Sequence, residues 1–223
     1  MKLTDIKNGN LSAEWAEKGY ELPKFDVEAV KAKTHAEPTW VHFGAGNIFR
    51  AFPAAILNDA LNSGKYDRGV IVAESFDYEI IDKAYQPYDN LSLLVCLKST
   101  GDIEKKVIAS VTESLKADYS FGADWARLVE IFQAPSLQMI SFTITEKGYA
   151  LRNMKGELMP VVVSDMENGP KQAHHAMAVV AAMLYARYQA GAMPIAMVSM
   201  DNCSHNGEKL RASVMEIVAA WVK

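Results

Sequence analysis

A stretch of twelve residues, TWVHFGAGNIFR at 39–50, constrains the fold of this chain more than any other. Residues 39–43 form an apolar run after a proline, which predicts a short buried strand. The glycine turn made by Gly44 and Gly46 ends this strand, and a helix is predicted to follow. The first glycine permits a tight turn, and the second lets the backbone approach a pyrophosphate at the helix N-terminus. Such a strand–turn–helix unit is typical of dinucleotide binding.

The helix after the glycine turn is predicted from apolar residues at every fourth position. Helical spacing places these residues on one face, and they are Ile48, Phe52, Ile56 and Ala60. Phe49 stands where the usual dinucleotide pattern has its third glycine. The turn is therefore also compatible with a plain strand-to-helix connection.

Arg50 favours the dinucleotide interpretation, because a guanidinium just inside the helix can clamp a phosphate through two parallel hydrogen bonds. The alternative for Arg50 is a solvated or structural arginine. The cofactor contacts predicted from this stretch are Phe43, Gly44, Gly46, Asn47, Ile48 and Arg50.

The composition excludes several classes of function. Half of the 223 residues are hydrophobic, which is enough for a proper core. The net charge is −4 and no block of basic residues occurs, which argues against nucleic acid and anionic membranes as partners. No apolar run approaches the ~20 residues of a membrane span, and residues 1–5 do not lead into a secretory signal. Cys96 and Cys203 form neither a disulfide framework nor a zinc pattern, so we expect a cytoplasmic protein without a zinc site.

A second buried parallel strand is predicted at residues 69–74, which are apolar up to their last position. Glu74 ends this strand, 28 residues after Gly46. In a dinucleotide fold, an acidic group at this place accepts hydrogen bonds from the adenosine ribose and repels a 2′-phosphate. Asp77 is the competing candidate, with a helix N-cap as the alternative role for its carboxylate.

The middle of the chain predicts a β insertion and one further parallel strand. Two β-like runs, residues 92–97 and 106–112, are joined by a Ser-Thr-Gly-Asp turn and predict an antiparallel hairpin. A helix that ends before Pro135 follows, and residues 138–144 predict the next parallel strand.

Thr145 and Glu146 follow that strand, in a loop that should share a crevice with Gly44. Thr145 is predicted to contact the cofactor. Glu146 at this place could bind the nicotinamide amide, substrate hydroxyls or water, and the alternative is that it pairs with a nearby base.

The last third of the chain predicts a helix at about 170–189, then a strand at 195–200 that leads to the polar loop 201–207. Cys203 and His205 in this loop do not form a convincing nucleophile pair, because no partner that would orient them can be identified. The adjacent His174 and His175 point in different directions on a helix, which argues against a shared metal.

A final helix from about residue 208 carries an apolar stripe that is predicted to be exposed and to promote self-association. The stripe consists of Leu210, Val214, Ile217, Val218 and Trp221.

Four stretches in order along the chain resemble the long-chain mannitol dehydrogenase family, which includes fructuronate reductase (mannonate oxidoreductase). They are residues 41–52, 107–113, 141–149 and 201–207. The resemblance implies a Rossmann domain that binds NAD(H) or NADP(H), a helical C-terminal domain, and hydride exchange with a polyol, ketose or keto-uronate. It places Asn202 at the substrate carbonyl oxygen and Glu146 near a proton path, with the general acid/base lysine beyond Lys223.

We therefore expect a Rossmann-like, doubly wound α/β fold with a mostly parallel sheet, a β-hairpin insertion and a missing C-terminal helical domain. The predicted parts are an N-terminal arm at 1–38, an NAD(P)-binding domain at 39–207 and a connecting helix at 208–223. The expected activity is that of a polyol or uronate oxidoreductase, with fructuronate and mannonate as the leading substrates and this chain as the cofactor-binding part. The alternatives are a non-catalytic nucleotide-binding module and one chain of a split enzyme.

Overall fold

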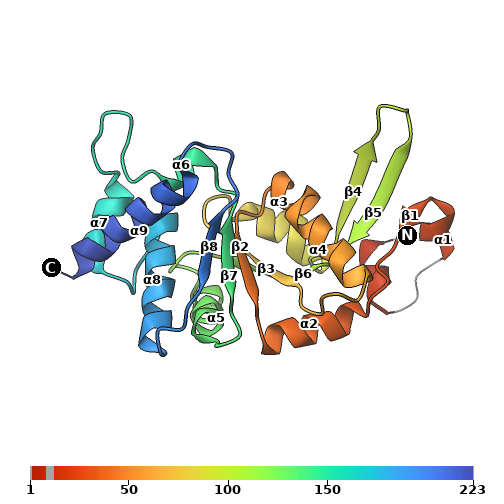
Figure 1. The fold of residues 1–223 in the computed structure, drawn as a ribbon, viewed down its shortest axis with the longest axis horizontal. Coiled ribbons are helices and arrows are strands. Elements are labelled where there is room, and N and C mark those ends of the chain that lie inside the picture. Colours follow the sequence, from red (N-terminus) through yellow and green to blue (C-terminus); the bar gives the residue numbers. More distant parts are fainter. Residues whose placement is uncertain (1, 9–12, 223) are drawn as a thin grey trace.

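A five-stranded parallel sheet forms the centre of the molecule in a computed structural model that describes residues 2–8 and 13–222 (Figure 1). The strand order is β6-β3-β2-β7-β8, and every neighbouring pair is parallel. The strands are β2 (Trp40–Phe43), β3 (Val70–Glu74), β6 (Val111–Lys116), β7 (Met139–Phe142) and β8 (Ala196–Ser199). The order confirms the predicted doubly wound α/β fold.

Alternating side chains of the central strands enter two separate cores, because successive residues of a strand point to opposite faces of the sheet. Val41 and Phe43 of β2 belong to one core, together with Ile71 of β3. Val70 and Val72 of β3 belong to the other. The sheet is therefore covered on both faces, which explains why its central strands are almost entirely apolar.

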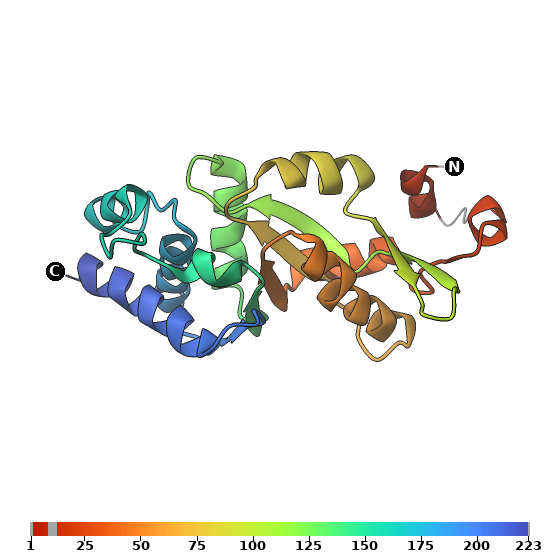
Figure 2. The same cartoon turned by 90° about the horizontal axis from the view of Figure 1, so that it is seen from above.

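Helices form the two outer layers, one on each side of the sheet (Figures 1 and 2). The layer that contributes to the first core consists of α5 (Gly122–Gln133), α6 (Thr145–Tyr149), α7 (Pro160–Asn168), α8 (Ala176–Gln189) and α9 (Asn206–Trp221). The layer on the second core consists of α2 (Val27–Ala36), α3 (Asn47–Ala51), α4 (Pro53–Asn62) and the π-helical turn η2 (Ile81–Tyr85).

A small sheet and the N-terminal arm lie at the far end of the molecule, beyond α4 (Figure 1). The sheet has the order β1-β5-β4, and β4 and β5 form the predicted antiparallel hairpin. The elements are η1 (Leu3–Asn8), α1 (Ala13–Glu17), β1 (Tyr20–Glu21), η3 (Gln86–Tyr88), β4 (Ser92–Leu97) and β5 (Ile103–Ile108). Ile6 and Trp15 of the arm are buried with Val107 of β5, in a third core.

The parallel strand β6 is absent from the sequence prediction, which merged its beginning with the hairpin. The chain instead turns at Ala109 and Ser110, and the next six residues join the main sheet beside β3. Thr112 and Ser114 make the strand look half polar, although both side chains are buried. A polar sequence at the edge of a parallel sheet hides a strand from a search for apolar runs.

The helix predicted after the glycine turn is confirmed as α3 and α4, but its apolar repeat faces solvent and not the core. Ile48, Phe52 and Ile56 are 71%, 66% and 57% exposed. The buried face contains Phe49 of α3 and Leu57 of α4. The helix breaks at Phe52, just before Pro53, and the break shifts the buried face of the second segment relative to the first.

The last helix also differs from its prediction, because its apolar stripe is packed. Leu210, Val214 and Ile217 are buried against α8 and belong to the first core. The predicted self-association depended on an exposed stripe, and the buried residues of this stripe are not exposed in the structure.

The helix predicted at 170–189 begins later, at Ala176, where the His175 side chain accepts a hydrogen bond from the backbone of Met177. A separate helix, α7, begins at Pro160, in a part of the chain for which no helix was predicted. None of the helices within residues 2–8 and 13–222 combines the length and apolar character that crossing a bilayer requires.

Candidate functional site

The carboxyl ends of β2, β3, β7 and β8 bring four loops to one edge of the sheet. β2 connects onward to β3 on one side, whereas its other neighbour, β7, connects onward to β8 on the opposite side. The chain thus changes direction between β2 and β7. Open α/β sheets bind ligands in the crevice at such a point.

Gly44 lies at this point and cannot be replaced by a larger residue without distortion. Its φ is +107°, and a Cβ atom there would lie 2.3 Å from the carbonyl oxygen of Thr143 at the end of β7. Its N–H donates to the carbonyl oxygen of Ala73, at a distance of 2.9 Å, on the other neighbouring strand. The first glycine therefore fits the turn tightly between β3 and β7.

Gly46 is different, because its backbone is extended, with φ −72° and ψ −179°, and nothing lies within 4 Å of a Cβ built there. The protein itself does not need glycine at this position. A glycine in open space at the start of a helix is consistent with a ligand that approaches the backbone closely.

The Glu74 carboxylate is 8% exposed and ties the glycine turn to the loop after β3. Its Oε2 accepts a hydrogen bond from the Ala45 N–H at 2.7 Å. Its Oε1 accepts from the N–H groups of Ser75 and Phe76, both at 2.9 Å, and of Asp77 at 3.3 Å. Only Oε2 keeps capacity for a further donor, such as one ribose hydroxyl.

Arg50 lies one turn into α3, and its guanidinium is 5.7 Å from the centre of the Tyr85 ring. The guanidinium donates to Oδ1 of Asn47 at 2.5 Å, and the Tyr85 hydroxyl donates to the Ala45 carbonyl at 2.8 Å. Among the described residues, the buried Nε of Arg50 has no hydrogen-bond partner. The guanidinium thus keeps donors for an additional anionic group near the glycine turn.

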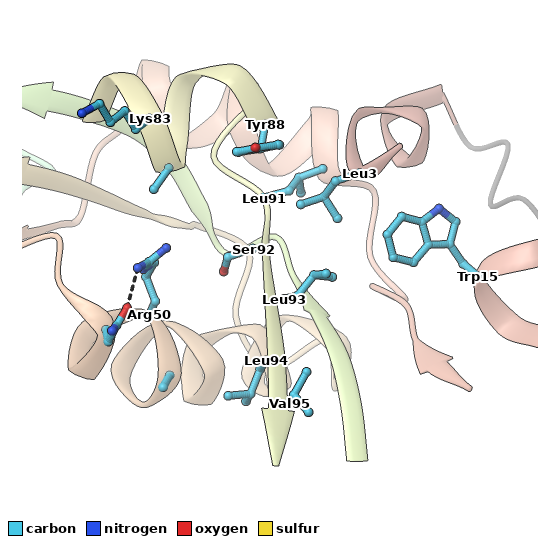
Figure 3. Close-up of a pocket in the computed structure, with 13 residues that line it drawn as sticks. Leu3, Trp15, Arg50, Lys83, Tyr88, Leu91, Ser92, Leu93, Leu94 and Val95 are labelled. Atoms are coloured by element: carbon cyan, nitrogen blue, oxygen red, sulfur yellow. Dashed lines mark hydrogen bonds between the residues drawn. The ribbon is translucent and has the colours of Figure 1, made fainter. Parts of the chain in front are cut away.

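An open pocket of about 720 Å³ borders this region (Figure 3). Asn47 and Arg50 contribute to one wall, and Lys83 lies across from Arg50 in the close-up. Leu93 and Val95 of β4 form part of the apolar remainder. The pocket therefore extends from α3 toward the small sheet and not toward β7.

His42 holds the ends of β2 and β7 together from within the sheet. The ring is fully buried and stacks on Phe49, with ring centres 4.2 Å apart. Its Nδ1 lies 2.7 Å from the Ser141 hydroxyl and its Nε2 lies 2.8 Å from the Thr143 hydroxyl. Burial lowers the pKa of His42 to about 3, so the ring is neutral near pH 7.

We expect His42 to make the protein sensitive to acid. The pKa of His42 lies at about 3 in the folded state and near 6.5 in the unfolded state, so unfolded chains bind more protons between these values. Stability should therefore fall as the pH drops below 6.5, by about 1.4 kcal/mol per pH unit, or about 2.7 kcal/mol at pH 4.5. Urea unfolding from pH 7.5 to 4.5 measures the slope, and His42→Gln should reduce it by this amount, whereas His175, whose pKa burial also lowers, keeps its own share. An equal slope in the variant would contradict the assignment to His42.

The loop after β7 is held by Asp201, which follows β8. The Asp201 carboxylate accepts hydrogen bonds from the N–H groups of Ile144 and Thr145, both at 3.0 Å, and from the Tyr149 hydroxyl at 2.6 Å. Thr145 has a φ of +64°, which is a strained conformation for a β-branched residue. Partial burial raises the pKa of Tyr149, so this phenol stays protonated and keeps donating to Asp201.

These contacts connect the four loops into one edge, from Glu74 through the glycine turn and Thr143 to Thr145 and Asp201. Gly46, Asn47, Ile48 and Arg50 are contributed by the turn and by α3, as predicted. Phe43 is not available to a ligand, because its side chain is buried and stacks on Phe142 with ring centres 5.4 Å apart.

The two residues predicted for catalysis lie on the β7–β8 side. Asn202 is exposed in the loop after β8. Glu146 is exposed at the start of α6 and forms an ion pair with Lys209 of α9, which is the alternative role that the sequence left open.

Sequence reasoning missed Asp201, Tyr149 and His42 as site-building residues. Asp201 and Tyr149 stand in the two segments that were singled out, but nothing in a sequence shows that a carboxylate after one strand caps the loop after another. Across the parts of the chain that the structure describes, no three His, Cys, Asp or Glu side chains gather in a way that could hold a metal ion. His174 lies instead 2.9 Å from the Asp118 carboxylate.

Comparison with known proteins identifies the fold and the family. A sequence profile of the mannitol dehydrogenase Rossmann domain matches residues 38–223. D-mannonate oxidoreductase of Thermotoga maritima is 54% identical over 211 residues, which cover 95% of this chain and 39% of that protein. Mannitol 2-dehydrogenase of Cereibacter sphaeroides is 29% identical over 222 residues, covering 90% of this chain and 42% of that protein.

A solved structure agrees with the sequence comparison. Pseudomonas fluorescens mannitol 2-dehydrogenase, in a ternary complex with NAD and D-mannitol, is similar with a TM-score of 0.78 at 26% identity. The similarity covers 99% of this chain and 42% of that one, so the chain spans about two fifths of the length of these relatives. The extent of the profile match shows that this chain belongs to the mannitol dehydrogenase family of oxidoreductases, and the part of the family that it matches is the Rossmann domain.

Proposed function

We propose that this chain binds NAD(H) across the carboxyl edge of its main sheet and forms the cofactor-binding part of a polyol or keto-uronate oxidoreductase. The observation that carries the proposal is the glycine turn at the point where the sheet changes direction. Gly44 is required there by the fold, whereas Gly46 faces open space in which a ligand can approach the backbone. The structure of a relative in complex with NAD supports the choice of dinucleotide.

The residues divide along the edge into three regions. Gly44, Gly46 and Arg50, with the backbone of Asn47 and Ile48, would hold the pyrophosphate, because they surround the turn and carry unused donors. Glu74 would accept one hydrogen bond from the adenosine ribose at Oε2. Its negative charge would disfavour a 2′-phosphate, so NAD is preferred and NADP is the alternative.

Thr145 and Asn202 lie on the β7–β8 side and would face the nicotinamide and the substrate. When bound, the nicotinamide supplies hydride exchange with a carbonyl carbon. The Asn202 amide would donate to the substrate oxygen, on which negative charge develops during reduction. Glu146 would assist proton transfer together with Lys209, its ion-pair partner. The general acid/base is proposed to lie outside these 223 residues.

The substrate we favour is the fructuronate–mannonate pair. This choice rests on the 54% identity to D-mannonate oxidoreductase, compared with 29% to a mannitol 2-dehydrogenase.

Calorimetric titration with NADH and NADPH tests the proposal. We expect saturable binding of NADH to one site and weaker binding of NADPH, because Glu74 meets the 2′-phosphate. We expect no turnover of fructuronate or fructose by the 223-residue chain alone. Binding of neither dinucleotide would contradict the proposed function, and turnover would place the general acid/base within this chain, with Lys147 as the first candidate.

A further inference from the structure

Phe76 is a large apolar side chain that the fold leaves almost entirely in solvent. It is 91% exposed, more than any other phenylalanine in the described chain. It stands two residues after the end of β3, at the same sheet edge as the glycine turn. An aromatic side chain with no packing role in a ligand-binding crevice is a candidate contact for the ligand.

The loop that carries Phe76 is held rigidly, although the side chain is exposed. The buried Glu74 carboxylate accepts the Phe76 N–H at 2.9 Å, and the same carboxylate accepts the N–H groups of the two flanking residues. The Tyr78 hydroxyl lies 3.1 Å from the Asp118 carboxylate and 3.3 Å from the Ser75 carbonyl, which fixes the loop from its other end. The aromatic ring is thus presented on a preorganised backbone.

The position of Phe76 along the carboxyl edge of the sheet determines which nucleoside of the dinucleotide it would contact. Under the proposed function the pyrophosphate would lie over β2, so one nucleoside would extend toward β3 and β6 and the other toward β7 and β8. Thr145 and Asn202 define the β7–β8 side as the side of hydride transfer. The nucleoside over β3 is therefore the adenosine, whose ribose is already assigned to Glu74.

We propose that Phe76 stacks on the adenine ring, and that Glu74 acts as the positioning residue that presents it. This inference rests on the proposed function. A flat purine offers a π face to an aromatic ring, and base–aromatic stacking strengthens binding without needing hydrogen-bond partners on the base. Phe76 would then contribute affinity for any ligand that carries adenosine.

Three ligands and three variants test the inference in the 223-residue chain. The ligands are NADH, ADP and reduced nicotinamide mononucleotide, with the weaker two measured by competition. Phe76→Ala should weaken NADH and ADP by the same factor, roughly 5- to 100-fold, and leave the mononucleotide unchanged. Phe76→Tyr should retain the affinity of the wild type, because it keeps the ring.

Tyr188→Ala is the matched control. Tyr188 is 68% exposed near the end of α8, where the chain turns toward the opposite edge of the sheet, so its loss should leave all three affinities unchanged. Both alanine variants should unfold at the wild-type temperature, because neither side chain is buried. Unchanged ADP and NADH affinity in Phe76→Ala would overturn the stacking role while the proposed function stands. Failure of the wild type to bind NADH would overturn both.

Discussion

Replacing Arg187 with methionine is expected to lower the free energy of unfolding by about 3–5 kcal/mol. Arg187 is 2% exposed on α8, and all five of its N–H groups donate to backbone carbonyl oxygens. The acceptors lie 2.8–3.1 Å away and belong to Phe132, Ala134, Leu137, Met193 and Pro194.

These carbonyls come from two chain segments, the end of α5 with its connection to β7, and the connection from α8 to β8. Arg187 therefore joins two loops by donating to backbone carbonyl groups of both. Burial lowers the pKa of Arg187, but a guanidinium remains charged in proteins. Methionine fills a similar volume and leaves the carbonyl groups without donors in an apolar environment.

Urea unfolding of Arg187→Met measures this effect, and Arg152→Met provides the control. Arg152 makes an exposed bidentate ion pair with Glu216, so the same substitution there should change stability little. Arg187→Lys should also be destabilising, because an ammonium group has three donors for five acceptors. Equal stability of Arg187→Met and Arg152→Met would contradict this role.

The two glycines of the turn are expected to respond in opposite ways to alanine. Gly46→Ala should keep or raise stability, by about 0.4–1 kcal/mol, because alanine adopts the observed backbone and meets nothing within 4 Å. The same methyl group would occupy the space into which the pyrophosphate must come. We expect NADH affinity to fall at least roughly tenfold, about 1.4 kcal/mol.

Gly44→Ala should instead damage the protein before any ligand is added. A φ of +107° costs an L-residue about 1–3 kcal/mol. The new Cβ would also lie 2.3 Å from the backbone oxygen of Thr143, which cannot rotate away. Thermal unfolding and NADH titration of both variants separate the two roles. Equal NADH affinity of Gly46→Ala and the wild type would contradict the proposed approach of the pyrophosphate.

The parts of the fold that the sequence predicts well are those in which local pattern and tertiary environment agree. β2, β3 and β7 are covered on both faces and consist largely of buried residues, so their apolar runs predict them and their ends place the loops correctly. The hairpin of β4 and β5 is predicted from a different pattern. Apolar and polar residues alternate along it, because only one of its faces is packed.

The failures occur where local periodicity and tertiary environment disagree. Ile48, Phe52 and Ile56 have helical spacing and face solvent, whereas the buried face of α3 and α4 is formed by other side chains. The sequence does not show that the apolar stripe of α9 packs against α8. α8 has apolar residues on every side, so no single face of it stands out as the one that contacts α9. β6 is hidden by Thr112 and Ser114, whose burial depends on their neighbours.

The candidate site divides in the same way. The glycine turn, Arg50 and Glu74 follow from a pattern that is confined to β2, the helices after it and β3. The supporting hydrogen bonds of His42 and Asp201 join residues 52 to 101 positions apart in the chain, and no local pattern specifies them. Glu146 was assigned from its position and from the family resemblance, whereas its ion pair with Lys209 depends on how α9 packs.

A crystal structure of this chain grown with NADH would show where the dinucleotide binds. We expect the pyrophosphate at Gly44 and Gly46 with Arg50 on one of its oxygens, the adenine ring on Phe76 and the nicotinamide beside Thr145. A dinucleotide bound elsewhere, such as in the pocket lined by Leu93 and Val95 with the glycine turn empty, would contradict this expectation.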